Sequence, residues 1–338
     1  MKRKVRFVVI GCGHIGKRHA AMIQANPDAE LIALVDIKEQ TSLGIDHFGV
    51  PFFNNISQLL AAGLIYDVVN IAVPNGLHAS LAKEILISGS DVVIEKPMAL
   101  SSIDAEQVIS LAKEKGRKIF VVMQNRYSPP VAWIKEVVAS GMLGKLYMVQ
   151  VSCYWNRDER YYQKGSWHGT KSLDGGTLFT QFSHFIDIMY WLFGDVKHIA
   201  TRLYDFNHQD ATEFEDSGIV QFDFLKEGIG TINFSTSVWD RNMESSITII
   251  AEKGSVKIGG QYMDKVEYCH IDHYTMPELP PSPAGNDYGT YKGSASNHNL
   301  LIQNVIDVVN NESVMTTTPE EGLAVVQLIE RIYSAAKL

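Results

Sequence analysis

The sequence predicts an α/β protein with two parts, a doubly wound parallel sheet followed by an α+β domain with a mostly antiparallel open sheet. Three observations support this prediction. Short apolar runs alternate with amphipathic stretches up to residue 124, longer strand-like runs follow one another after it, and a glycine-rich turn joins the first run to the first stretch. We therefore expect one domain at 1–124 and a second at 125–338.

The first third of the chain has the pattern of a parallel sheet covered on both faces. Five apolar runs are typical of buried strands, at 5–10, 31–35, 68–73, 92–94 and 119–123. The stretches between them have helical spacing, at 15–25, 76–88 and 101–115. Strands that alternate with helices in this way form parallel pairs.

The pattern changes after residue 124. A helix is predicted from Pro129 and Pro130 to about Gly141. Strand-like runs then follow at 147–154, 218–224, 229–238, 245–251 and 255–258, and helical patterns close the chain at 297–310 and 319–336. Neighbouring strands without long helices between them favour an antiparallel sheet with helices on one face.

Composition excludes several kinds of partner. The formal net charge of −8 and the lack of a basic stretch argue against nucleic acid. Cys12, Cys153 and Cys269 are far apart, so we expect free thiols and no metal. The apolar run 7–10 is shorter than a signal sequence needs, and no run approaches the ~18 residues of a membrane span. We expect a soluble cytoplasmic protein.

The turn after the first strand has the spacing G-x-G-x-x-G at Gly11, Gly13 and Gly16, between an apolar run and a helical pattern. In this context the first glycine permits the turn, the second admits a pyrophosphate and the third allows close helix packing. Asp36 ends the second strand, about 20 residues on, where a carboxylate accepts from ribose hydroxyls and repels a 2′-phosphate. The sequence therefore predicts a Rossmann domain that binds NAD rather than NADP.

Polar residues follow two further strands. Asn75 and His78 come after the fourth predicted strand, and Glu95 and Lys96 after the next. Ligands bind beyond the carboxyl ends of strands in open parallel sheets, so we expect all four at the cofactor. His14 lies in the glycine turn and is expected near the phosphates.

The segment 175–194 is almost entirely apolar but carries His184 and Asp187, one helical turn apart. Such a histidine is by itself more typical of a core than of an active site, and Asp187 is interpreted as structural. Apolar residues at helical spacing around it form a core face.

The motifs at 11–19, 73–80, 93–100 and 175–194 together resemble the glucose–fructose oxidoreductase / inositol dehydrogenase family over essentially the whole chain. The resemblance implies NAD- or NADP-dependent oxidation of sugar or cyclitol hydroxyls, and an open sheet that mediates a homo-oligomer, a dimer or a tetramer. It also implies that Lys96 and His184 meet at the nicotinamide. Residues 123–131, 154–162, 166–176, 294–308 and 316–337 are similar to the UDP-N-acetylglucosaminuronate 3-dehydrogenases, which make keto-sugar precursors for bacterial surface polysaccharides. Those enzymes have arginine where this chain has His168.

The resemblance extends the expected site. The residues that it adds at the cofactor are Ile15, Val73, Pro74, Asn125 and Trp167. For a substrate with a diphosphate and a carboxylate we expect Lys96 and His184 together with Arg126, Tyr127, Arg157, Arg160, Lys171 and Gln181.

Histidine suits the role of base because its pKa lies near neutral pH. We therefore expect His184 to take the hydroxyl proton while Lys96 polarises the hydroxyl. Many relatives carry aspartate four residues before the histidine, where this chain has Thr180, which supplies a hydrogen bond but no charge. A second hypothesis makes Lys96 the base. The alternatives for the whole protein are a catabolic sugar or myo-inositol dehydrogenase and a non-catalytic NAD-binding protein.

Overall fold

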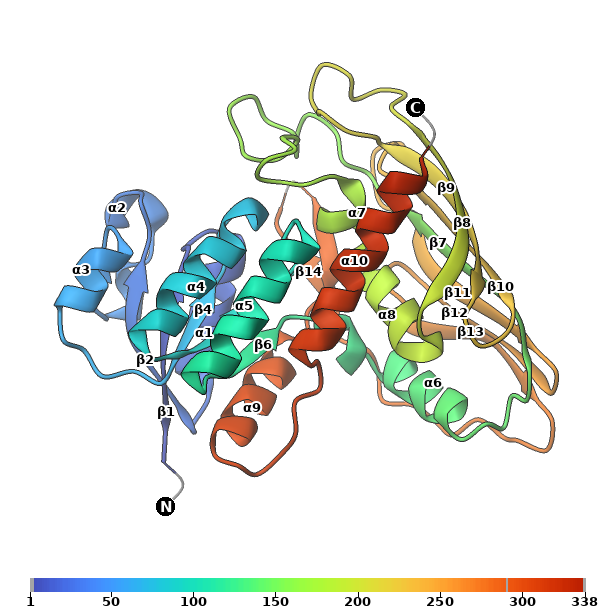
Figure 1. Ribbon diagram of the computed structural model, residues 1–338, viewed down its shortest axis with the longest axis horizontal. Coiled ribbons are helices and arrows are strands. Elements are labelled where there is room, and N and C mark those ends of the chain that lie inside the picture. Colours follow the sequence, from blue (N-terminus) through green and yellow to red (C-terminus); the bar gives the residue numbers. More distant parts are fainter. Residues whose placement is uncertain (1–2, 290, 337–338) are drawn as a thin grey trace. The chain divides into compact units, whose positions relative to one another are not determined.

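The computed structural model describes residues 3–289 and 291–336, which divide into two compact units (Figure 1). The N-terminal unit comprises the residues up to Met123 together with His298–Val326. The C-terminal unit comprises Gln124–Asn297 and the residues from Gln327 onward. The segment 298–326 therefore groups with the N-terminal unit, whereas the sequence pattern assigned it to the second domain.

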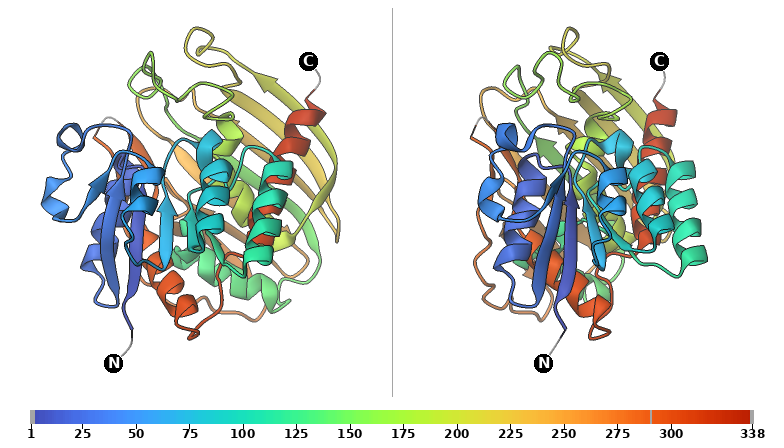
Figure 2. Two further views of the ribbon diagram at one scale, coloured as in Figure 1. Left: turned by 60° about the vertical axis from the view of Figure 1, so that its left-hand side comes forward. Right: turned by 90° about the vertical axis from the view of Figure 1, so that its left-hand side faces the viewer.

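In the described part of the N-terminal unit, six parallel strands form a sheet in the order β3-β2-β1-β4-β5-β6 (Figure 2). The strands are β1 (Val5–Ile10), β2 (Ala29–Val35), β3 (Phe52–Phe53), β4 (Val68–Ile71), β5 (Asp91–Ile94) and β6 (Ile119–Val121). The five predicted strands are confirmed, and β3 was missed because two residues show no periodicity. The strand order reverses between β1 and β4, which is the point where doubly wound sheets bind ligands.

Helices connect these strands and pack in pairs. The helical elements of this unit are α1 (His14–Ala25), α2 (Gln40–Leu43), η1 (Asp46–Phe48), α3 (Ile56–Ala61), η2 (Asn75–Leu77), α4 (His78–Ser88), α5 (Ser102–Lys115) and α9 (His298–Val309). The helix α4 packs against α5, and α1 packs against α9. At the end of α1, the Asn26 amide donates to Gln303 of α9 at 2.9 Å. This hydrogen bond is one of the contacts that join a segment distant in sequence to the N-terminal unit.

A seven-stranded sheet organises the described part of the C-terminal unit, in the order β13-β12-β11-β7-β10-β9-β8. Its strands are β7 (Leu146–Tyr154), β8 (Val196–Tyr204), β9 (Ser217–Phe224), β10 (Ile229–Ser235), β11 (Glu244–Ala251), β12 (Gly254–Gly259) and β13 (Lys265–Ile271). The pair β7–β10 is parallel and the other pairs are antiparallel, which confirms a mostly antiparallel sheet. The two missed strands, β8 and β13, are the edges, where exposed polar residues weaken the apolar signal. A separate hairpin pairs β14 (Gly285–Asp287) with β15 (Lys292–Ala295).

The register separates the two faces of this sheet. One row across four strands consists of Val220, Ile232, Val151 and Ile247, all buried. The next row on the opposite face consists of Gln221, Thr231, Gln150 and Thr248. Since paired residues share a face, the sheet has one apolar and one largely polar face.

Helices cover the apolar face (Figure 1). The helical elements are η3 (Gln124–Tyr127), α6 (Pro129–Ala139), α7 (Thr177–Thr180), α8 (Ser183–Phe193) and α10 (Pro319–Ala335), of which α10 begins in the N-terminal unit. Phe182, between α7 and α8, packs its ring 5.6 Å from Trp155 and 5.5 Å from Phe234. Within residues 3–289 and 291–336, none of the helices has the length and apolar character needed to cross a membrane.

Candidate active site

The turn between β1 and α1 is shaped for close approach by a ligand. Gly11 has a φ of 89°, and a Cβ there would lie 2.3 Å from the Ala72 carbonyl oxygen. A Cβ on Gly16 would lie 1.6 Å from the Gly11 oxygen, so only glycine lets α1 pack here. At Gly13, by contrast, no described atom other than those of Gly13 and its two chain neighbours lies within 4 Å of the Cβ position. The turn therefore leaves room for a phosphate beside the first amides of α1, those of His14 and Ile15.

Asp36 follows β2 and is fixed by two backbone amides. Its Oδ2 accepts from Cys12 N at 2.6 Å and its Oδ1 accepts from Lys38 N at 2.9 Å. The carboxylate remains partly exposed. It thus joins the end of β2 to the glycine turn. It also holds an oriented acceptor there, which suits a dinucleotide with free ribose hydroxyls.

The residues after β4 lie at the same edge of the sheet. Val73 and Pro74 lead into the short helix that begins with the buried Asn75. His78 is fully buried, with Nδ1 2.7 Å from the Pro97 oxygen and Nε2 2.9 Å from the Val73 oxygen. His78 therefore joins the loop after β4 to the loop after β5.

Glu95 and Lys96 follow β5. The Glu95 carboxylate is buried, and its Oε1 lies 3.0 Å from His19 Nε2. Its Oε2 accepts from the Lys96 amide at 3.1 Å. Lys96 is half-buried and a cis peptide bond joins it to Pro97. Both carboxylate oxygens of Glu95 are thus bonded to groups of the N-terminal unit.

His184 lies in the first turn of α8 and is 3% exposed. Gln181 and Phe182 form a break between α7 and α8. The Phe182 carbonyl accepts from the amides of Phe185 and Ile186, so the hydrogen bonding of α8 begins there. Thr180 and Gln181 are also buried. The break lets a second helix begin immediately before His184 instead of continuing α7.

One turn after His184, Asp187 forms a buried ion pair with Arg126 of η3. The Arg126 Nε and Nη2 atoms donate to the two carboxylate oxygens at 2.9 and 2.6 Å, and both side chains are essentially inaccessible. The guanidinium also stacks 4.9 Å from the Trp191 ring. This bidentate pair anchors α8 and agrees with a structural role for Asp187. It occupies Arg126, which the sequence assigned to substrate.

Arg157 is a second buried arginine, and it contacts a residue in the break before α8. Its Nε donates to Gln181 Oε1 at 2.9 Å, and Gln181 in turn donates to the Tyr161 hydroxyl at 2.8 Å. The guanidinium lies 4.8 to 5.1 Å from the ring centres of Trp155, Tyr161 and Tyr291. Burial lowers the pKa of Arg157. Arg157 and Gln181 were predicted as substrate ligands. The structure brings them together as buried partners at the break between α7 and α8.

Thr180 has a charged partner that the sequence did not predict. Its hydroxyl donates to the buried Asp174 carboxylate in a short contact and also lies 2.8 Å from the Asp174 carbonyl oxygen. The second carboxylate oxygen of Asp174 accepts from the Gly169 amide at 2.8 Å. A carboxylate is therefore present beside Thr180, although it comes from six residues upstream. The only sequence signal was its place immediately before Gly175.

Other predicted residues lie in loops of the C-terminal unit. Arg160 is exposed and paired with Asp158, and Lys171 is exposed. The Trp167 ring stacks 4.0 Å from His168, which replaces the expected arginine. Asn125 accepts from Ser294 at 2.8 Å, and Tyr127 is half-buried in the same short helix η3.

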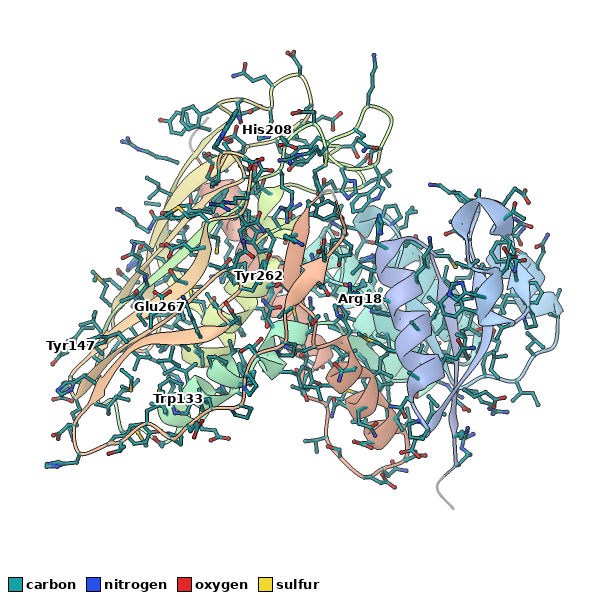
Figure 3. All side chains as sticks on the ribbon, turned by 180° about the vertical axis from the view of Figure 1, so that it is seen from behind. Arg18, Trp133, Tyr147, His208, Tyr262 and Glu267 are labelled. Atoms are coloured by element: carbon teal, nitrogen blue, oxygen red, sulfur yellow. The ribbon has the colours of Figure 1, made fainter. Side chains whose placement is uncertain are left out.

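Two clusters of histidine and carboxylate place possible metal-ligand atoms within 4.8 Å of one another: His19, Glu95 and His298, and Asp205, His208 and Asp216. In the second cluster, His208 contacts Asp216 at 3.2 Å through Nδ1 and the Arg157 carbonyl in a short contact through Nε2. His208 is labelled in Figure 3. Hydrogen bonds explain this arrangement, and we assign no metal there.

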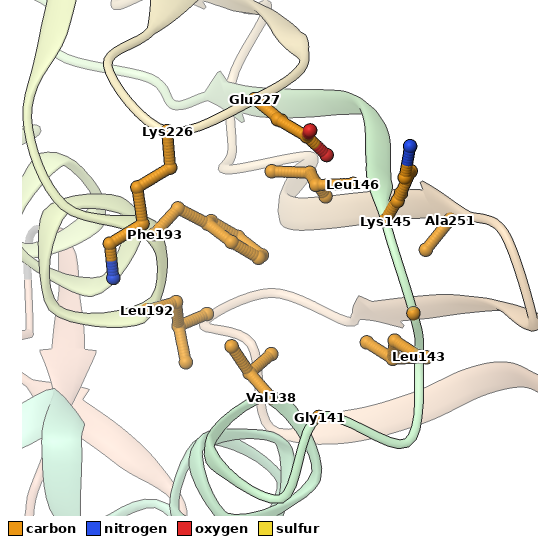
Figure 4. Close-up of a pocket in the computed structure, with 11 residues that line it drawn as sticks. Val138, Gly141, Leu143, Lys145, Leu146, Leu192, Phe193, Lys226, Glu227 and Ala251 are labelled. Carbon is orange, nitrogen blue, oxygen red and sulfur yellow. The ribbon is translucent and has the colours of Figure 1, made fainter.

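An open pocket of about 360 Å³ lies at the other end of α8, lined by Leu192 and Phe193 (Figure 4). Lys145, Lys226 and Glu227 are the charged residues of its lining. His184 begins the helix and these residues end it, so roughly 12 Å of helix separates them. The pocket is thus distinct from the predicted site.

Family models cover most of the chain. One described as an oxidoreductase family with an NAD-binding Rossmann fold matches residues 5–123, and one described as the C-terminal alpha/beta domain of that family matches 135–337. The inositol 2-dehydrogenase of Rhizobium meliloti is 27% identical over 285 residues, 81% of this chain and 82% of its own length.

Two solved structures are similar over nearly the whole chain. The WlbA dehydrogenase of Bordetella pertussis, crystallised with NADH and UDP-GlcNAcA, has a TM-score of 0.87 and 31% identity and covers 99% of this chain and 97% of its own. The WlbA dehydrogenase of Chromobacterium violaceum, in complex with the same two molecules, has a TM-score of 0.86 and 28% identity, with coverage of 99% and 94%.

Proposed function

Because the chain belongs to the Gfo/Idh/MocA oxidoreductase family, we propose that this NAD-dependent enzyme oxidises C3 of UDP-N-acetyl-2-amino-2-deoxyglucuronate. The observation that carries the proposal is the similarity to two WlbA dehydrogenases whose structures hold NADH and UDP-GlcNAcA. The product would be a keto-sugar precursor of a surface polysaccharide.

The mechanism assigns one role to each of two residues. When bound, NAD supplies the hydride acceptor. Lys96 polarises the sugar hydroxyl through its ammonium group, and His184 takes the proton as the C–H bond breaks. Thr180 contributes a hydroxyl that is already bonded to Asp174. The alternative, with Lys96 as the base, requires burial to lower the lysine pKa.

Similarity to inositol dehydrogenases favours a second candidate, a catabolic sugar or cyclitol dehydrogenase. The two candidates differ in whether a nucleotide is recognised. A thermal shift with UDP, and NADH absorbance with UDP-sugars, glucose and myo-inositol, distinguishes them. Turnover only with free polyols would contradict the nucleotide-sugar proposal, and no hydride transfer with any of them would favour a non-catalytic NAD-binding protein.

Substitution of the two proposed catalytic residues tests the mechanism. We expect His184→Ala and Lys96→Met each to lower kcat by about 10²-fold or more, because each removes a group that acts on the reacting hydroxyl. The matched control is His270→Ala, which removes an exposed histidine of the same unit. Near-normal turnover in His184→Ala would overturn its assignment as base.

A further inference from the structure

The turn that carries Lys96 is surrounded by three histidines from three different helices. They are His19 of α1, His78 at the start of α4 and His298 at the start of α9, and all three are inaccessible to solvent. Fully buried histidines are costly unless their nitrogens are used. Their contacts converge on the residues immediately before and after Lys96.

The contact before Lys96 is made through Glu95. Its Oε1 accepts from His19 Nε2 at 3.0 Å, and its Oε2 accepts from the Lys96 amide at 3.1 Å. The Asn70 amide lies 3.0 Å from His19 Nδ1 and donates to it, which places the His19 proton on Nε2, facing Glu95. A chain of hydrogen bonds therefore runs from the core of β4 to the backbone of Lys96.

His298 adds an electrostatic contact to the same carboxylate. Its Nε2 lies 3.6 Å from Glu95 Oε1, beyond hydrogen-bond length. The contact is an ion pair only when the ring is protonated, which burial opposes by lowering the His298 pKa. Burial alone would raise the pKa of Glu95, but the two histidines outweigh it and hold the pKa well below its ordinary value. Glu95 thus stays ionised and able to accept the Lys96 amide.

The contact after Lys96 is made by His78. Its Nδ1 lies 2.7 Å from the Pro97 oxygen and its Nε2 lies 2.9 Å from the Val73 oxygen. Both ring nitrogens thus face carbonyl oxygens, and a nitrogen that carries a proton donates to the oxygen beside it. His78 thereby holds the turn from the side opposite to Glu95.

We infer that His19, His78 and His298 are positioning residues for Lys96. His19 and His298 fix the Lys96 amide through Glu95, and His78 fixes the Pro97 carbonyl directly. The inference gives Glu95 and His78, predicted as cofactor ligands, a different task. The role in catalysis rests on the proposed function, but the position of the lysine does not. Its test is therefore chosen to need no substrate.

The experiment measures how fast acetic anhydride acylates Lys96 in the full-length chain across a range of pH, with mass spectrometry as the readout. We expect His78→Leu and His298→Leu to change the rate by about threefold or more, or to shift the apparent lysine pKa by roughly half a unit. His78→Gln, which keeps a donor, should restore most of the wild-type profile. His47→Leu, at an exposed site in the same unit, is the control.

Folded variants that retain NAD affinity and acylate Lys96 like the wild type would overturn the inference. If His78→Leu does not fold, His19→Gln and His298→Leu carry the same test. One equivalent of Zn²⁺ bound by the wild type and lost in His298→Leu would also overturn it, because the cluster would then be a metal site. Failure of every UDP-sugar as a substrate would instead contradict the proposed function and leave the acylation result intact.

Discussion

At the scale of single residues, the two buried arginines of the C-terminal unit serve the helix that bears His184. Arg126 pairs with Asp187 beyond His184, and Arg157 bonds to Gln181 before it. Sequence reasoning assigned both to the diphosphate or carboxylate of a substrate because arginine suits anions. A buried partner cannot be inferred from residue type, so the distinction required the structure.

The Arg126–Asp187 pair gives a stability prediction. Asp187→Asn leaves a buried guanidinium without its counter-charge, and we expect the free energy of unfolding to fall by about 3–5 kcal/mol. Urea denaturation measures this loss. The control is Glu320→Gln, which removes the exposed partner of Lys113 and should cost at most about 1 kcal/mol. Equal losses in the two variants would contradict a stabilising role for the buried pair.

The Thr180–Asp174 contact gives a second prediction. Thr180→Val removes the hydroxyl donor from a buried carboxylate, and we expect a loss of about 1–3 kcal/mol in unfolding free energy together with a lower kcat. Thr180→Ser keeps the hydroxyl and should retain most of both. If the serine and valine variants behave alike in denaturation and turnover, the hydrogen bond to Asp174 is unimportant.

At the scale of elements, the helix pair α7–α8 and the loops beside it were the least predictable part of the fold. The apolar run 175–194 predicts one helix, but α7 ends at Thr180 and α8 begins at Ser183. Gln181, in the break, bonds to Arg157, which lies 24 residues upstream. The strands β1, β4 and β5 were predictable because burial on both faces makes them continuously apolar. The glycine turn was predictable because its spacing is local, whereas Asp174 and the histidines around Lys96 act through tertiary contacts.

The loop 205–216 predicts a pH dependence of stability. Burial lowers the pKa of His208, but its bonds to Asp216 and the Arg157 carbonyl outweigh this effect and raise the pKa above its ordinary value. Burial raises the pKa of Asp216, but His208 and the backbone amides outweigh it and lower that pKa. The histidine contribution is complete below its unfolded pKa of about 6.5 and is lost as pH rises through the folded value, while the Asp216 contribution is lost in acid.

We therefore expect the wild type to lose more unfolding free energy than His208→Gln between about pH 6 and about pH 8. Urea denaturation of both proteins at the two pH values measures the difference. The exposed His198, which pairs with Asp223, provides the control variant His198→Gln. A parallel decline in all three proteins would contradict the assignment to His208.

At the scale of the whole molecule, the largely polar face of the seven-stranded sheet carries an exposed apolar row. Ile229, Met148 and Ile250 form one row across three strands, and the first two are 56% and 41% exposed. From the family resemblance we predict that this sheet mediates a homo-oligomer. An apolar row on this largely polar face fits contact with a second copy.

We predict that the double variant Met148→Lys, Ile229→Lys forms a smaller species than the wild type, because two buried charges would oppose the contact. Light scattering after size exclusion measures the mass. Ile87→Lys, which changes an isoleucine 65% exposed on α4, should leave the mass unchanged. A monomeric wild type, or a double variant of unchanged mass, would contradict the prediction.

The pairing of α9 with α1 has a practical consequence for anyone who dissects this chain. A fragment that stops at residue 124 would contain every strand of the parallel sheet yet lack the helix that packs against α1. It would also lack His298, the third histidine beside Glu95. The cofactor half is thus discontinuous along the gene, and a fragment intended to fold alone needs 298–326 joined back to it through a linker.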